Sequence, residues 1–128
     1  TAHESGFLNQ HAEAPIKITL PSVSQIVSSF YRRGVGETAY PDTAALYPDI
    51  IAILRQEIED LVTERVSYIQ IDAPRYTYFV DERWRQRFRD QDEDPDLIID
   101  KWIDADNASI SGIKLQGTTL AMHLCRGL

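Results

Sequence analysis

Three stretches of the chain carry hydrophobic and polar patterns that are typical of β-strands. Residues 15–20 alternate apolar and polar side chains and are followed by Pro21, a pattern that predicts a short strand. Residues 66–72 are almost entirely apolar or β-branched, as in a strand covered on both faces. Residues 118–123 predict a third strand.

Two longer segments carry helical spacing. Apolar residues recur at this spacing between Ala45 and Val62, and charged residues occupy the opposite side. Together with Pro48, this pattern predicts a main helix over residues 48–65 after a short earlier turn. A second helix is expected to begin at Asp94-Pro95 and to end at Gly112, because aspartate and proline favour helix starts and glycine favours helix ends.

The other segments are less regular. Residues 1–14 show no clear period, which predicts a loose N-terminal lead-in. Residues 22–30 are compatible with a short helix opened by a serine cap or with a loop. Residues 75–94 are rich in aromatic and arginine side chains, and they are expected to form a loop with a short helix.

The order strand, helix, strand, helix, strand predicts an α/β fold with a parallel βαβαβ arrangement. Three parallel strands would leave sheet edges and faces open to water. The simplest account is therefore a partial domain over residues 15–128, a consecutive part of a (β/α)8 TIM barrel. The alternative is a small open α/β domain closed by oligomerisation.

Composition narrows the function classes. The chain has 128 residues, a formal net charge of −7 and a single cysteine. The acidic balance argues against nucleic-acid binding. No apolar run approaches the roughly 20 residues of a membrane span, and no signal peptide is evident. A single cysteine cannot form an intrachain disulfide, which fits a reducing, cytoplasmic location.

Candidate chemistry lies at the ends of the second and third predicted strands. In a strand, residues i and i+2 point to the same side, so the nitrogen of His123 and the sulfur of Cys125 could converge on one point. That pair would be half of a tetrahedral zinc site, although a lone cysteine is more often a small buried side chain. Asp72 ends the preceding strand, where it is either a functional carboxylate or a turn cap before Pro74.

The motif Tyr68-Ile-Gln-Ile-Asp72-x-Pro74 followed by His123-x-Cys125 resembles the cobalamin-independent methionine synthase family. Three further features agree with this resemblance. An acidic helix precedes the aspartate strand, and the following helix carries Asp106-Asn107-Ala108. The chain also ends in His-Leu-Cys-Arg-Gly, as in the short stand-alone relatives of the synthase. The resemblance covers residues 15–128 and corresponds to the middle of that family's catalytic barrel.

The resemblance implies a zinc-dependent methyltransferase that moves a methyl group from a folate-like donor to a thiol such as homocysteine. His123 and Cys125 would be zinc ligands, and Asp72 would hold the amino group of homocysteine. Zinc would keep the substrate thiol, whose ordinary pKa is about 8.5, as a thiolate. By the same analogy, a glutamate and a second cysteine lie later in the barrel. The chain alone is therefore expected to be inactive, and none of its residues is assigned a catalytic role.

Two positions depart from the family pattern. Ala73 stands where the family has a glutamate, and residues 23–30 contain no tryptophan that could face a pterin. A related zinc-dependent alkyl-thiol transferase with another donor therefore stays open. So does a non-catalytic truncated relative that acts as an assembly module, as a homo-oligomer formed through its open sheet edges. A further alternative is a small enzyme that uses Asp72 and His123 as an acid–base pair.

Overall fold

Three parallel strands form the centre of the protein: β1 (Lys17–Pro21), β2 (Tyr68–Asp72) and β3 (Thr119–His123). The computed structural model describes residues 2–31 and 34–125. The strands are hydrogen-bonded in the order β1-β2-β3, and both pairs are parallel. The α/β class and the parallel sheet predicted from the sequence are confirmed.

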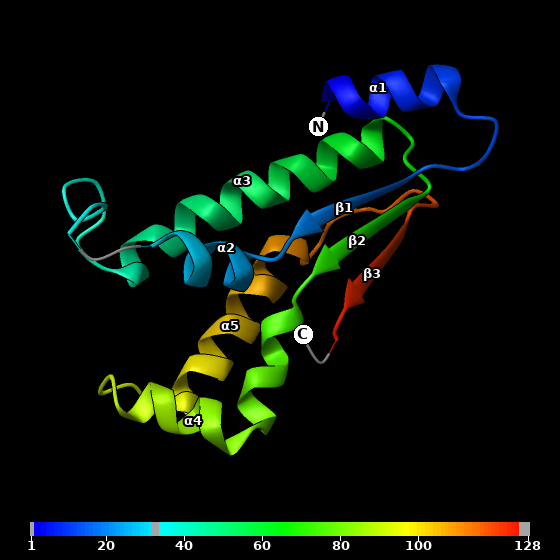
Figure 1. Ribbon diagram of the computed structural model, residues 1–128. Helices are drawn as coiled ribbons and strands as arrows, with labels where there is room; N and C mark the ends of the chain where they lie inside the picture. The colour runs from blue at the N-terminus through cyan, green and yellow to red at the C-terminus, as the bar shows by residue number, and fades with distance from the viewer. Residues whose placement is uncertain (1, 32–33, 126–128) are drawn as a thin grey trace.

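The helices connect and flank these strands (Figure 1). Their bounds are α1 (Ala2–His11), α2 (Val23–Phe30), α3 (Thr43–Thr63), the 3-10 helix η1 (Pro74–Val80), α4 (Glu82–Arg89) and α5 (Pro95–Ile110). None of the helices in the described ranges is long and apolar enough to cross a membrane.

Helix α3 starts earlier than the sequence pattern predicts. It begins at Thr43, with Pro48 inside it, so the expected start at residue 48 is wrong. The Asp42 side chain accepts a hydrogen bond from the backbone N–H of Ala45 at 2.9 Å, which caps the first turn. Tyr47 from this turn is buried in the core. The cap and the packing together keep the helix continuous in spite of the proline.

Local capping signals decide the other helix ends. The Ser22 side chain caps α2 by accepting a hydrogen bond from Gln25 N–H at 3.0 Å. Residues 23–30 therefore form the serine-capped helix and not the alternative loop. Asp94 caps α5 in the same way. Gly112, at a φ of 75°, follows the end of α5. The expected start and end of this helix are confirmed.

The expectation of a loose lead-in over residues 1–14 is wrong for residues 2–11, which form α1. Ser5 is fully buried, and its hydroxyl donates a hydrogen bond to the Glu64 side chain. The Asn9 amide donates to the backbone carbonyl of Glu64 at 3.1 Å. These polar contacts tie α1 to the end of α3. Leu8 is the residue of α1 that packs against the hydrophobic core, and a single such position gives no helical period in the sequence.

Among the residues that the structure describes, helices cover one face of the sheet. Ile18, Leu20, Ile69 and Ile71 point to the helices and are nearly inaccessible to solvent. The alternate residues of β1 are exposed and those of β2 are half-buried. The expectation that β2 is covered on both faces is therefore wrong for the described part of the chain. We call the second side, formed by the alternate residues of the three strands, the open face.

Candidate functional site

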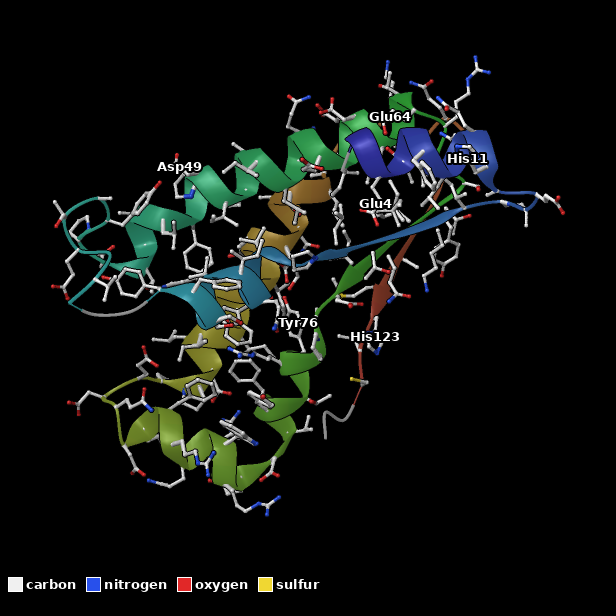
Figure 2. The ribbon with its side chains drawn as sticks, turned by 45° about the horizontal axis from the view of Figure 1, so that its top comes forward. Glu4, His11, Asp49, Glu64, Tyr76 and His123 are labelled. Carbon is white, nitrogen blue, oxygen red and sulfur yellow. The ribbon has the colours of Figure 1, made fainter. Side chains whose placement is uncertain are left out.

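The carboxyl ends of the three strands place two of the predicted site residues side by side. The register pairs Pro21 with Asp72 and Asp72 with His123. Residues paired in parallel strands point to the same side of a sheet, so Asp72 and His123 both lie on the open face. Figure 2 shows His123 at the end of β3.

Asp72 and His123 form a direct contact. The Nδ1 atom of His123 lies 2.9 Å from Oδ1 of Asp72. A carboxylate can only accept a hydrogen bond, so Nδ1 carries the proton in this contact. In the neutral imidazole, Nε2 then keeps its lone pair. The side chains are 41% (His123) and 35% (Asp72) exposed, so a ligand can reach the pair from solvent.

A short relay of hydrogen bonds orients the Asp72 carboxylate. Gln70 Nε2 donates to Asp72 Oδ1 at 2.7 Å, and Lys17 Nζ donates to Gln70 Oε1 at 2.6 Å. The lysine therefore fixes which end of the Gln70 amide faces the aspartate. Lys17 Nζ also lies 5.4 Å from the centre of the Tyr68 ring, a distance typical of a cation–π contact. The relay crosses all three strands from Lys17 to His123.

Cys125 lies outside the strand that was predicted to aim it. β3 ends at His123, so strand geometry does not place the Cys125 side chain on the same side as His123. Its thiol is free and partly exposed. Arg126 and Gly127, which follow it in the motif, are outside the described residues. Within those residues, no cluster of three or more histidine, cysteine, aspartate or glutamate side chains could hold a metal ion.

The side chains of His123 and Cys125 are nevertheless chemically suited to supply two of the ligands of a zinc site. An imidazole nitrogen and a thiolate sulfur are both zinc donors. Metal-binding histidines almost always donate their other ring N–H to a carboxylate, a carbonyl or water. The contact between His123 and Asp72 has this arrangement.

Asp106 is a buried acidic residue to which the sequence pattern assigned no role. It is only 3% exposed. It accepts hydrogen bonds from Ser24 N–H at 3.0 Å, from the Ser24 hydroxyl at 2.7 Å and from the Tyr76 hydroxyl at 2.8 Å. Burial and the adjacent carboxylate raise the pKa of Tyr76 well above its ordinary value. A signal existed in the sequence, because Asp106 lies four residues after Trp102 on the apolar side of its helix.

No protein-family model, no curated protein and no solved structure matches this chain. Any function must therefore be argued from the residues and their geometry.

Proposed function

We propose that this chain carries part of a zinc-dependent methyltransferase of the cobalamin-independent methionine synthase type. The substrates would be a folate-like methyl donor and a thiol such as homocysteine. The observation that carries the proposal is the contact between Asp72 and His123 at the carboxyl ends of adjacent parallel strands. Ligands of open α/β sheets and α/β barrels bind at this end of the strands.

Each residue has a definite task in this proposal. His123 would bind the metal through Nε2, because Nδ1 is held by Asp72. Cys125 would supply a thiolate from the segment after β3. Bound zinc would supply the positive charge that keeps a substrate thiol deprotonated near neutral pH. Both hydrogen bonds that Asp72 receives from described side chains end on Oδ1, and the amino group of homocysteine would bind at Oδ2.

We also propose that the sheet is a consecutive part of a (β/α)8 barrel. Strand order follows chain order, and the helices α2, α3 and α5 contact one another. Their side of the sheet holds the buried core residues Ile18, Leu20, Ile69 and Ile71. A doubly wound sheet carries helices on both faces, whereas a barrel carries them only outside. The polar open face would then line the barrel interior.

Zinc content of the full-length protein, purified under metal-replete conditions, tests the proposed site. We expect stoichiometric zinc in the wild type and its loss in His123→Ala and in Cys125→Ser. Asp72→Asn should weaken zinc binding by roughly 10- to 100-fold, as other changes beside a metal-binding histidine do. His11→Ala is the matched control, because His11 is exposed on α1. Zinc-free wild-type protein, or zinc retained in both ligand variants, would refute the proposal.

The same contact favours a second candidate, an enzyme that uses His123 as a general base oriented by Asp72. Cys125→Ser separates the two candidates. It should abolish thiol alkylation if Cys125 binds the metal, and it should leave acid–base catalysis intact. Ala73 and the absence of tryptophan from residues 23–30 also allow a related zinc-dependent alkyl-thiol transferase with a donor other than folate.

A third candidate is a non-catalytic module that pairs with a second copy through its sheet edges. β1 and β3 are the two edge strands of the described sheet. Met122 and Leu124, on and after β3, are 46% and 57% exposed. Light scattering after size-exclusion chromatography tests this candidate, and a monomer at all concentrations would rule out self-association.

A further inference from the structure

We propose that Asp106 is a positioning residue that holds the strand ends so that Asp72 meets His123. The chemical purpose of this positioning rests on the function proposed above. The contacts that carry the inference do not depend on a metal.

Asp106 lies on α5 and bonds to the segments that follow two different strands. Ser24 comes three residues after the end of β1, and Tyr76 comes four residues after the end of β2. Both bond to the Asp106 carboxylate. Figure 2 shows Tyr76 in the segment that follows β2. One buried side chain therefore ties together the two connections that leave the carboxyl end of the sheet.

The connection after β1 leads directly to Asp72. The Ser24 hydroxyl lies 2.8 Å from the Ser22 hydroxyl. The backbone N–H of Ser22 donates to the carbonyl of Asp72 at 2.9 Å. Holding Ser24 therefore holds Ser22, and Ser22 holds the backbone of Asp72.

The connection after β2 restrains the same residue from its other side. Ala73 is 1% exposed, and its backbone N–H donates to the carbonyl of His123 at 3.0 Å. Tyr76 N–H in turn lies 3.4 Å from the carbonyl of Ala73. The bond between Tyr76 and Asp106 therefore fixes the turn that carries Asp72 and reaches His123 through the backbone.

Side-chain packing between α5 and β3 is incomplete. A cavity of about 140 Å³ lies between α5 and β3, lined by Ile71, Asp106, Ile110, Leu120, Ala121 and Met122. A void removes packing contacts from the side chains that line it. The position of His123 therefore depends more on hydrogen bonds at the strand end than on close packing beneath it.

The carboxylate is suited to this task in a way that an amide is not. All three partners of Asp106 are donors, and a carboxylate offers acceptors on both oxygens. Ser24 also lies in the first turn of α2, where a negative charge is favoured by the helix dipole. In Asp106→Asn, one of the two side-chain oxygens that bond to Ser24 and Tyr76 becomes an NH₂ group, which cannot accept.

The tautomer of His123 shows whether the Asp72 carboxylate is held against Nδ1. Imidazole ¹⁵N chemical shifts show which ring nitrogen carries the proton. They are measured on the complete chain after removal of any metal with a chelator, well above the ordinary histidine pKa of about 6.5, because zinc on Nε2 would itself exclude the Nε2–H form. We expect the Nδ1–H form in the wild type and its loss in Asp72→Ala, which removes the acceptor. Asp106→Asn should shift the population from Nδ1–H towards Nε2–H although Asp72 is still present.

Two further variants keep the test decisive. If Asp106→Asn does not fold, the double variant Ser24→Ala and Tyr76→Phe removes two of the three bonds and should produce the same tautomer shift. Ile58→Val is the matched control, because it loosens the core at a residue with no exposed surface and should leave the tautomer unchanged.

A wild-type tautomer in folded Asp106→Asn, or in the folded double variant, would overturn the positioning role. A shift in Ile58→Val equal to that in Asp106→Asn would overturn it as well, and so would an Nε2–H form in the wild type. Wild-type protein that contains no zinc but shows the Asp106-dependent tautomer would refute the proposed transferase and leave the positioning role standing.

Discussion

Replacing Pro48 by alanine should stabilise the protein. Pro48 lies inside α3 and its side chain is exposed. Proline has no backbone N–H, so it cannot donate to the carbonyl of Ala44 four residues earlier. Alanine would supply that donor without removing buried apolar surface.

An upper and a lower estimate bound the gain in the free energy of unfolding that we expect for Pro48→Ala. A proline in a helix interior is about 3 kcal/mol less favourable than alanine in host–guest systems. One restored backbone hydrogen bond is worth about 1 kcal/mol net. We therefore expect Pro48→Ala to raise the free energy of unfolding by about 1–3 kcal/mol. For a chain of this size, each 1 kcal/mol corresponds to roughly 4 °C in Tm.

Urea and thermal unfolding, followed by far-UV circular dichroism, measure this gain. Pro41→Ala is the matched control, because Pro41 is also exposed but precedes the Asp42 cap. It should be neutral or should lower stability by about 0.4–1 kcal/mol, since the unfolded chain gains freedom. Unchanged or lower stability in Pro48→Ala would refute the reasoning. It would indicate a helix that starts at residue 48, where a proline in the first turn costs little.

Two predictions concern pH. Burial, followed by the nearby Asp106 carboxylate, raises the pKa of Tyr47 to about 12. The stability that Tyr47 contributes should thus be complete below its ordinary pKa of 10.0 and lost as the pH rises from 10.0 towards 12. Urea unfolding across this range should show the loss in the wild type and a smaller one in Tyr47→Phe, and an equal loss in both would contradict it. Hydrogen bonds from the side chain and backbone of Arg83 lower the pKa of Asp81 to about 2. The contribution of Asp81 to the free energy of unfolding should be complete above its ordinary pKa of 3.8 and should be lost as the pH falls from there towards 2. Carbon NMR of the Asp81 carboxyl group measures this pKa, and a titration midpoint at the ordinary value would contradict the prediction.

The parts of this fold that depend on local chemistry can be predicted from the amino-acid sequence. The β-branched run before Asp72 and the mainly apolar run that ends at His123 predict strands, and both strands form. Asp94 before Pro95 predicts a helix start, and α5 starts there. The order of the elements predicts parallel pairing, because long crossovers join parallel strands. The neighbouring positions of Asp72 and His123 follow from that pairing.

Which distant groups meet depends on the three-dimensional packing of the chain. Helix α1 has no hydrophobic period, and it is held by contacts with Glu64, 59 and 55 residues from Ser5 and Asn9. The partners of Asp106 lie 82 and 30 residues away in the chain, and no local pattern names them. The polar open face was equally hidden, since the apolar composition of β2 does not show whether one or both of its faces are covered. Hydrogen bonding and burial between distant segments depend on how the helices pack, and that packing is a property of the whole fold.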